Sequence, residues 1–168
     1  MRYFIIGNGS NLLIKDEDFD GVVISLKNFN SVKIVKKRDY ESIYVESGIS
    51  LFQLNKFLQN NSISGLEWSY GIPGTLGGAI KMNAGAFNRS IFEFLEEITV
   101  LKNNKILKVK DFKSEYRNSY LSDEIILSAK LKLKSGNMHD ILNKINEYLN
   151  IRKEKQPYNF PSAGSVFK

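Results

Sequence analysis

The feature that most constrains the fold of this chain is a concentration of glycine between residues 70 and 87. The stretch YGIPGTLGGAIKMNAGAF holds five of the 12 glycines in the 168-residue sequence. Glycine lets the backbone adopt positive φ and lets another group lie directly on the main chain. A single turn needs only one or two such residues, so the cluster indicates a backbone surface that a flat or anionic group approaches. Tight packing of two backbone segments is the alternative explanation.

The length and composition indicate one ordinary domain or two small packed lobes. Hydrophobic residues make up 42% of the sequence and charged residues 25%, which is the usual balance of a globular protein. The sequence contains no cysteine and one histidine, which excludes disulfides and iron–sulfur clusters and disfavours zinc. It shows neither a signal peptide nor an apolar run long enough for a membrane helix. We therefore expect a cytoplasmic protein with no metal and no membrane partner.

The net charge of +6 is compatible with an anionic partner. The lysines are scattered along the sequence, however, and do not collect on one helical face. A solvated lysine-rich surface is the simpler explanation, and an electrostatic preference for phosphorylated small molecules is the alternative. Nucleic acid is not expected as a partner, because the sequence contains no arginine-rich stripe and no reader motif.

The periodicity of the apolar residues predicts more strands than helices. Strands are expected at residues 2–7 and 21–26 (both buried), 32–37, 41–47 and 123–134, and on either side of a turn at Asn103–Asn104. Helical spacing predicts one helix over residues 50–61, capped by Ser50, and a second that stops before Pro157. Because strands and helices do not alternate regularly, the expected fold class is α+β and not a doubly wound parallel sheet.

A first glycine loop, GNGSN at residues 7–11, follows the first predicted strand directly, where phosphate-binding loops lie. It is not a dinucleotide fingerprint, since position 12 is leucine, and it lacks the Gly-Lys-Ser/Thr of a P-loop. We expect consecutive main-chain N–H groups to form an anion-binding nest there, with help from Ser10 and Asn11. An ordinary turn is the alternative.

The second glycine loop carries the stronger signal. Pro73 is expected in the first turn of a short helix, with Gly74, Gly77 and Gly78 leaving the N–H groups of that helix bare. Asn83 adds an amide that can both donate and accept. Two glycine loops that each follow a strand-like stretch favour one extended phosphorylated cofactor over two unrelated turns.

Three further segments contain candidate functional side chains. In EYRNSY, Arg117 lies beside Tyr116 and Ser119, and such an arginine can clamp a carboxylate or stabilise an enolate. An exposed surface arginine is the equally simple alternative. In IRKEKQP, Lys155 closes the last predicted helix, where cations are favourable in any protein.

Ser165, in the segment PSAGSVFK, is not expected to be a hydrolase nucleophile. The single histidine, His139, begins a distant helix, so no base is evident for Ser165. A hydroxyl that only delivers a proton needs no such base in its ground state.

Taken in order, the segments GNGSNLLI, GIPGTLGGAIKMNAGAF, YRNSYL, RKEKQP and PSAGSVFK resemble the UDP-N-acetylenolpyruvoylglucosamine reductase family over essentially the whole chain. These FAD enzymes use NADPH to complete UDP-N-acetylmuramate in peptidoglycan synthesis. The resemblance implies an α+β FAD-binding domain of the vanillyl-alcohol-oxidase (PCMH) type, with two lobes around non-covalent FAD. It further implies that residues 1–20 belong to the first FAD-binding lobe, 21–155 to the second, and 156–168 to the start of a substrate domain.

The resemblance also assigns roles to residues. Arg117 would stabilise an enolate-like intermediate and Ser165 would donate a proton to it. Tyr116 and Lys155 would bind the UDP-sugar enolpyruvyl ether substrate, with Lys155 near the phosphates of that substrate or of NADPH. The residues expected to contact FAD are Gly7, Asn8, Gly9, Ser10, Asn11, Ile72, Pro73, Gly74, Thr75, Gly77, Gly78, Asn83, Gly85 and Ala86.

Two parts of the family pattern are missing from the sequence. These are an N-terminal Thr-Phe-x-x-Gly-Gly segment and the C-terminal substrate lobe with a catalytic glutamate. We therefore expect a fragment of a longer protein that is inactive alone and binds FAD weakly. Two alternatives stay open, namely another flavoprotein oxidase or dehydrogenase of the same fold, and a non-catalytic basic binding module.

Overall fold

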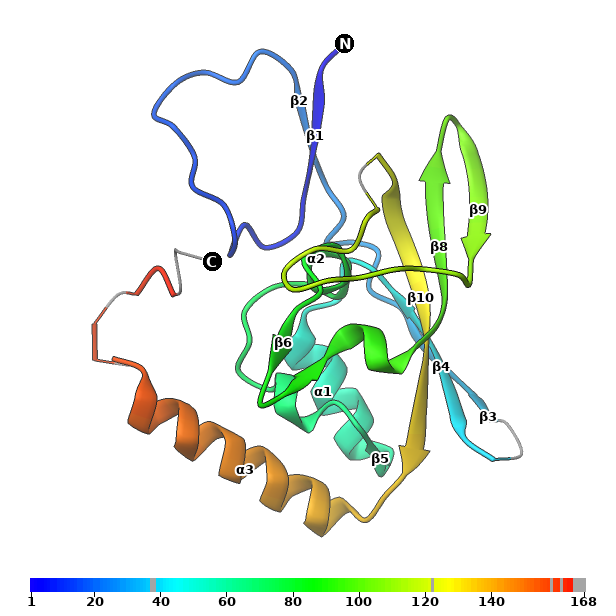
Figure 1. Cartoon of the computed structure of the whole chain (residues 1–168), viewed down its shortest axis with the longest axis vertical. Coiled ribbons are helices and arrows are strands. Elements are labelled where there is room, and N and C mark those ends of the chain that lie inside the picture. Colours follow the sequence, from blue (N-terminus) through cyan, green and yellow to red (C-terminus); the bar gives the residue numbers. More distant parts are fainter. Residues whose placement is uncertain (37–38, 122, 158, 161, 165–168) are drawn as a thin grey trace.

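The computed structural model describes residues 1–36, 39–121, 123–157, 159–160 and 162–164 of the chain. An antiparallel sheet of six strands forms its centre, with helices α1 (Leu51–Asn60) and α2 (Leu76–Lys81) against the sheet (Figure 1). The strand order is β3 (Val32–Lys36), β4 (Glu41–Glu46), β10 (Ile125–Ser135), β8 (Leu95–Lys102) and β9 (Lys105–Val109), with β5 (Ile63–Ser64) paired to one end of β10. The predicted α+β class is confirmed.

Several short elements connect the sheet to the helices. Strands β6 (Gly85–Ala86) and β7 (Arg89–Ser90) form a small antiparallel pair after α2. Two 3-10 helices, η1 (Glu67–Ser69) and η2 (Ile91–Phe94), precede α2 and β8 respectively. The long helix α3 (Met138–Lys155) follows β10 and packs against η1 and α1.

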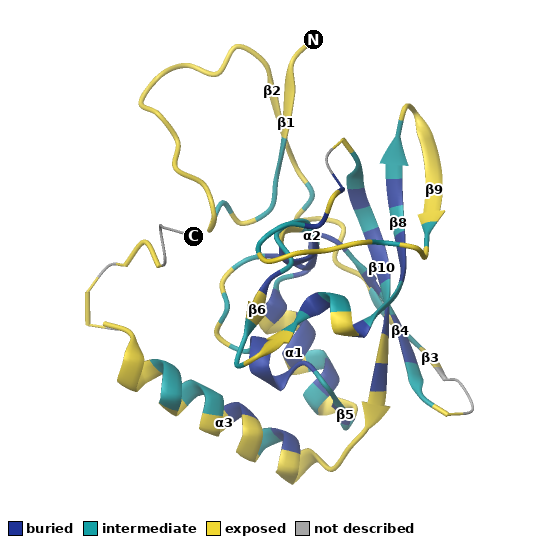
Figure 2. Ribbon diagram, viewed as in Figure 1, coloured by how far each residue is buried: buried dark blue, intermediate teal, exposed yellow. Residues whose placement is uncertain are grey.

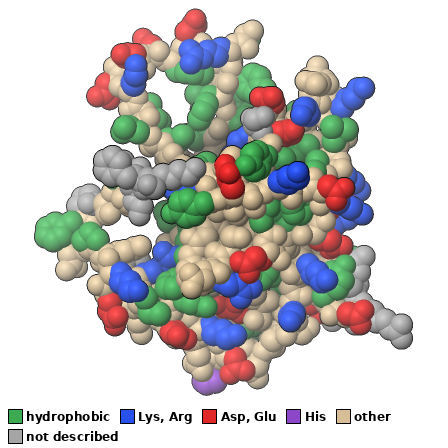
Figure 3. All heavy atoms as spheres, viewed as in Figure 1, with side chains coloured by type: hydrophobic (Ala, Val, Ile, Leu, Met, Phe, Trp, Pro, Cys, Tyr) green, Lys and Arg blue, Asp and Glu red, His purple; other side chains and the backbone are tan. Residues whose placement is uncertain are grey.

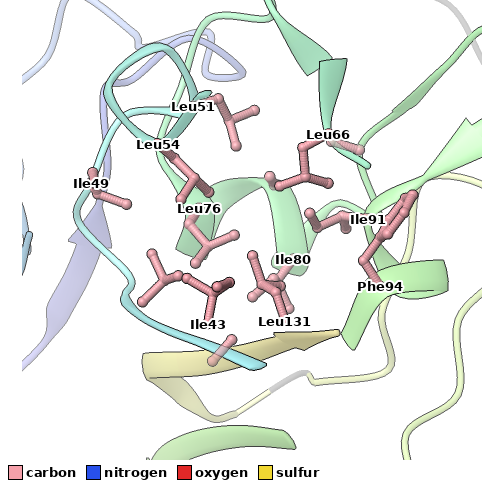
Figure 4. Packing of buried hydrophobic residues seen from close by; sticks show 14 of the residues in the cluster. Ile43, Ile49, Leu51, Leu54, Leu66, Leu76, Ile80, Ile91, Phe94 and Leu131 are labelled. Atoms are coloured by element: carbon pink, nitrogen blue, oxygen red, sulfur yellow. The ribbon is translucent and has the colours of Figure 1, made fainter. Parts of the chain in front are cut away.

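One hydrophobic core fills the space between the sheet and the two helices. Ile43 of β4, Leu131 of β10, Leu54 of α1 and Ile80 of α2 are all fully buried, and Figure 4 shows their side chains converging. Burying each such side chain contributes about 1.5–3 kcal/mol. Figure 2 shows the same pattern as buried segments along β4, β8 and β10.

Helix α1 begins where its sequence predicts. Ser50 is the N-cap, and its Oγ accepts from the Gln53 N–H at 3.1 Å while the Gln53 side chain accepts from the Ser50 N–H at 3.3 Å. This reciprocal capping box satisfies two donors that a helix start leaves open. Leu51, Leu54 and Leu58 lie on the buried side.

The structure also confirms the turn at Asn103–Asn104, the strands predicted at residues 32–37 and 41–47, and the helix end before Pro157. The β8–β9 turn places Asn103 at φ 49° and Asn104 at φ 58°, which asparagine tolerates better than most residues. Strands β3 and β4 pair with Ile34 opposite Ile43, although Arg38 of their turn lies outside the described residues. Helix α3 ends at Lys155, before Pro157.

The strands β1 (Tyr3–Ile6) and β2 (Val22–Ser25) form a separate parallel pair. The expectation of buried strands is correct for the strands and wrong for the burial, because Tyr3 is 55% and Val23 54% exposed. Parallel strands are usually covered on both faces, but the described elements leave this pair largely uncovered (Figure 2). Apolar side chains therefore gather on this part of the surface (Figure 3).

The remaining visible surface carries charges of both signs. Figure 3 shows Lys and Arg side chains scattered among Asp and Glu, without one basic patch on that face. The solvated lysine-rich surface expected from the sequence agrees with this view.

Candidate functional site

The structure brings the two glycine loops into direct contact. The Ser10 Oγ of the first loop donates to the Pro73 carbonyl of the second at 3.3 Å, across 63 residues of sequence. A Cβ built on Gly7 would lie 2.5 Å from the Thr75 Oγ1, and one on Gly74 would lie 3.1 Å from the Ser10 Oγ. A Cβ at Gly7 would therefore clash with the Thr75 hydroxyl, and one at Gly74 would press on the Ser10 hydroxyl, where the two loops meet.

The first loop keeps its main-chain donors available. Gly9 adopts φ +71°, a left-handed conformation that glycine adopts without a steric cost. Among the described residues, no hydrogen bond engages the N–H groups of residues 8–11. A run of unengaged N–H groups in a turn suits an anionic group.

The helix of the second loop starts later than expected. Pro73 does not lie in its first turn, because α2 begins at Leu76 with Thr75 as its N-cap. The Thr75 Oγ1 accepts from the Gly78 N–H at 3.3 Å. Threonine is a favourable N-cap residue. The presence of Thr75 directly before Leu76 was therefore a local signal for the helix start that the structure shows.

The N–H groups at the start of α2 are not bare, so that expectation is also wrong. The Leu76 N–H donates to the Ile49 carbonyl at 2.9 Å, and the Gly77 N–H donates to the Ser47 carbonyl at 2.8 Å. The segment between β4 and α1 supplies these acceptors. A phosphate at this site would therefore depend on the donors of the first loop and not on those of α2.

A groove of about 420 Å³ lies between β1 and the start of α2. The residues of β1 and Gly7 form one side, and Ser47, Thr75, Gly77 and Gly78 form the other. The volume is in the range of small-molecule sites. A Cβ on Gly77 would lie 2.9 Å from the Ser47 Cβ, so packing explains this glycine. A Cβ on Gly78 would meet only the Thr75 Oγ1, at the ordinary contact distance of 3.5 Å, and Gly78 lines the groove.

Ser47 was not predicted from the sequence as a site residue. Its side chain is 1% exposed, and its Oγ has no hydrogen-bond partner among the described residues. Buried hydroxyls normally have a partner. An orphaned hydroxyl at the wall of a groove is the kind of group that a polar ligand atom satisfies.

Lys81, at the end of α2, also lines the groove and was missed. Its Nζ donates to the Leu121 carbonyl. Burial lowers the pKa of the Lys81 ammonium, and the nearby carboxylates of Glu124 and Asp123 partly offset that effect. These two acidic residues line the same end of the groove. Only tertiary contacts bring them there, so no local sequence pattern identified them.

Arg117 reaches the first loop from the far part of the sequence. Its Nη2 donates to the Asn11 Oδ1 at 3.1 Å, across 106 residues. Arg117 adopts φ +61° at the tip of a tight turn. Its neighbour Tyr116 is 72% exposed. The Arg117 side chain therefore contacts the predicted cofactor loop.

The segment that ends the glycine cluster lies under this turn. The Asn83 Nδ2 donates to the Glu115 carbonyl at 2.9 Å, and the buried Asn83 Oδ1 has no partner among the described residues. A Cβ on Gly85 would lie 2.6 Å from the Arg89 carbonyl. The close β6–β7 pairing therefore accounts for Gly85 without any ligand, as the packing explanation predicts.

Gly71, the first glycine of the cluster, packs on α3, because a Cβ there would lie 3.3 Å from the Leu149 Cδ2 and 3.5 Å from the Arg152 Cδ. Two further predicted residues lie toward the C-terminal end of the chain. Lys155 is exposed in the last turn of this helix. Ser165 lies outside the described residues.

Within the described residues, no group of three or more His, Cys, Asp or Glu side chains is arranged to hold a metal ion. No helix in this part of the chain has the length and apolar character needed to cross a bilayer.

Comparison with known families identifies the general class of this protein. Residues 1–108 match the family described as FAD binding domain, and the chain belongs to that family. The chain can also be superposed on alkyldihydroxyacetonephosphate synthase with a TM-score of 0.61 over 79% of this chain and 27% of that one, at 21% identity. That likeness concerns the fold alone, while the family match confirms that the chain contains an FAD-binding domain.

Within this class the chain is similar to UDP-N-acetylenolpyruvoylglucosamine reductases, as its motifs predict. The relative from Clostridium novyi is 39% identical over 171 residues, which cover 99% of this chain and 54% of that protein. The crystal structure of the Thermus caldophilus reductase (MurB) matches with a TM-score of 0.85 at 33% identity, over 99% of this chain and 60% of that one. The chain thus spans about half the length of the curated relatives it matches.

Proposed function

We propose that this chain is the FAD-binding part of a UDP-N-acetylenolpyruvoylglucosamine reductase, which forms UDP-N-acetylmuramate for peptidoglycan with NADPH as reductant. The observation that supports this most is the contact of the first glycine loop with both the second loop and Arg117, next to the groove that Gly7 and Gly78 line. The names of the relatives support the choice of substrate. Because the chain spans about half of those relatives, the activity belongs to the longer protein.

The groove and the adjoining first loop offer contacts that would suit the cofactor of the family. The unengaged N–H groups of residues 8–11 suit its pyrophosphate, and the bare surface at Gly78 allows a planar group to approach. The apolar residues of β1 shield that group from water. The Ser47 Oγ offers a polar contact at the groove wall. Bound FAD would supply the hydride that reduces the enolpyruvyl double bond.

The chain's own residues would handle the charge and the proton. The Arg117 guanidinium, held beside the first loop, would stabilise the negative charge that develops on the substrate carboxylate as an enolate forms. Ser165 would deliver the proton to the adjacent carbon. Tyr116 and Lys155 would bind the sugar nucleotide, and Lys155 supplies a positive charge for its phosphates.

The division into residues 1–20, 21–155 and 156–168 is part of the same proposal. Strand β1 would belong to the first lobe and strand β2, which begins at Val22, to the second. The pairing of these two strands would then join the two lobes. A cytoplasmic location, and the absence of nucleic-acid and membrane partners, stay predictions.

The deciding experiment follows the flavin in the protein that contains this chain. Under anaerobic conditions NADPH should bleach the flavin absorbance, and the enolpyruvyl sugar nucleotide should restore it. Restoration by oxygen alone, with no response to the nucleotide, would show an oxidase of the same fold. The absence of any flavin absorbance would indicate a non-catalytic binding module. The 168-residue chain by itself is expected to show no turnover.

A further inference from the structure

The turn that carries Arg117 has an unusual backbone. The Glu115 N–H donates to the Asn118 carbonyl at 3.0 Å, and the Asn118 N–H donates back to the Glu115 carbonyl at 3.2 Å. Tyr116 and Arg117 form the tip between these two residues. Arg117 has φ +61° and Tyr120 has φ +47°, a region that residues with a Cβ disfavour. Such conformations persist where the surroundings hold them, and they cluster at functional sites.

The side chain of Glu115 supplies much of that hold. Its Oε1 accepts from the Asn118 Nδ2 at 3.0 Å and its Oε2 accepts from the Tyr120 hydroxyl at 2.8 Å. Its main-chain carbonyl accepts from the Asn83 Nδ2 at 2.9 Å. One residue therefore closes both sides of the turn and anchors it to the glycine segment beneath.

We infer that Glu115 is a positioning residue that fixes the turn so that Arg117 reaches the first glycine loop. The inference rests on the proposed function for the role of Arg117, while the hydrogen bonds stand independently. Glu115 is exposed and contributes nothing to the hydrophobic core. Its replacement should therefore loosen the turn without unfolding the chain.

The Tyr120 phenol reports on this contact. Its hydrogen bond to Glu115, together with desolvation and the negative charge of that carboxylate, raises the pKa of Tyr120. Glu115→Ala removes all of the Glu115 side-chain contributions. The pKa of Tyr120, followed by NMR of its ring carbon, should then fall toward the ordinary tyrosine value.

The effect on Arg117 is tested with a double-mutant cycle on FAD affinity, measured with purified chain. Glu115→Ala should weaken FAD binding about tenfold, the size expected for loss of hydrogen bonds to a charged group. Arg117→Ala should weaken it to a similar extent. If Glu115 acts through Arg117, adding Glu115→Ala to Arg117→Ala should change the affinity no further. Two fully additive effects would overturn the inference.

Two variants serve as controls. Glu115→Gln keeps an acceptor for Asn118 and can donate to the Tyr120 oxygen, so it should restore most of the affinity that Glu115→Ala loses. Glu154→Ala removes an exposed carboxylate from α3 and should leave the affinity unchanged. A Glu115→Gln variant as weak as Glu115→Ala would contradict a role based on geometry.

The two proposals fail in different ways. If the unaltered chain does not bind FAD, the proposed cofactor site is wrong, and the positioning role is still decided by NMR. In that case, an Arg117 Nε–H signal and Arg117–Asn11 contacts that persist in Glu115→Ala would overturn the role, and their loss would support it. If FAD binds but Glu115→Ala changes neither the affinity nor the Tyr120 pKa, the cofactor site stands and the positioning role is wrong.

Discussion

Arg117 and Asn11 are joined by a hydrogen bond of 3.1 Å between the guanidinium and the side-chain carbonyl, although 106 residues separate them. Neither residue forms part of the core. Their contact nevertheless connects the predicted cofactor loop with the arginine that is predicted to stabilise charge. The tertiary fold thus brings these two distant segments together.

The contact between the two glycine loops can be tested by adding a methyl group at Gly7 and by removing the side chain of Thr75. Gly7→Ala should place a methyl group against the Thr75 Oγ1, at 2.5 Å in the unaltered geometry, and should destabilise the chain by about 1–3 kcal/mol. Thr75→Gly removes the obstructing atoms and costs only a few tenths of a kcal/mol as an N-cap change.

Urea unfolding of the two single variants and the double variant measures the coupling. We expect Gly7→Ala to be less harmful in the Thr75→Gly background. Equal losses in both backgrounds would show that the two loops do not touch there.

Neighbouring glycines at the start of α2 should respond in opposite ways to alanine. A Cβ on Gly77 would lie 2.9 Å from the Ser47 Cβ and 3.1 Å from its carbonyl, whereas one on Gly78 would meet only the Thr75 Oγ1 at 3.5 Å. Gly78→Ala should stabilise the helix by about 1 kcal/mol. Gly77→Ala should be less stable than Gly78→Ala by about 1–3 kcal/mol.

Thermal unfolding of the two variants side by side decides this, because each is the matched control for the other. Equal melting temperatures would contradict the packing of α2 against Ser47.

A carboxylate in the sheet should make stability depend on acid pH. Glu97 of β8 is 6% exposed and lies 3.0 Å from the Lys130 ammonium, with Lys108 and Lys110 slightly farther away. The hydrogen bond with Lys130 is the largest cause that holds the pKa of Glu97 below its ordinary value of 4.5. A carboxylate with a depressed pKa stabilises the folded state above the ordinary pKa, and this contribution is lost as the pH falls through the lowered value.

The free energy of unfolding should therefore fall as the pH drops below about 4.5, and Glu97→Gln should flatten that fall. Glu154→Gln, on the exposed side of α3, is the control and should leave the slope as it is. A slope that is unchanged by Glu97→Gln would contradict the role of this ion cluster.

The local parts of the fold could be predicted because their causes are local. Ser50 could be predicted as the N-cap because it directly precedes residues at helical spacing, and the Asn103–Asn104 pair specifies a turn by itself. The end of α3 before Pro157 follows from the geometry of proline. Each of these predictions needs only the chemistry of neighbouring residues.

The missed features depend on distant partners. The start of α2 was placed too early because Pro73 is a common first residue of helices, whereas Thr75 was not considered as the cap. The N–H groups of α2 were predicted to be bare, but they donate to the carbonyls of Ser47 and Ile49. No local sequence pattern connects these two residues to α2, so the prediction failed. The exposure of β1 was missed because an apolar run predicts a strand and does not say what covers it.

The candidate site was predicted in part. Both loops and Arg117 were identified, and the structure places them together. Ser47 and Lys81 were not identified, since a serine after a strand and a lysine in a short helix are ordinary until the groove between them is known. Packing alone explains Gly77 and Gly85, whereas Gly78 lines the groove with room for a side chain. Glycines of one motif can therefore have different structural reasons.

The central claim is that the groove beside Gly78 receives FAD, and titration of the chain with FAD tests it most directly. Gly78→Leu would fill the groove from an exposed position with room for a Cβ, and Asn150→Leu adds the same side chain on the exposed side of α3. We predict quenching of flavin fluorescence by the unaltered chain and by Asn150→Leu, and at least tenfold weaker binding by a folded Gly78→Leu. Equal affinity for all three proteins, or no binding by the unaltered chain, would contradict the account.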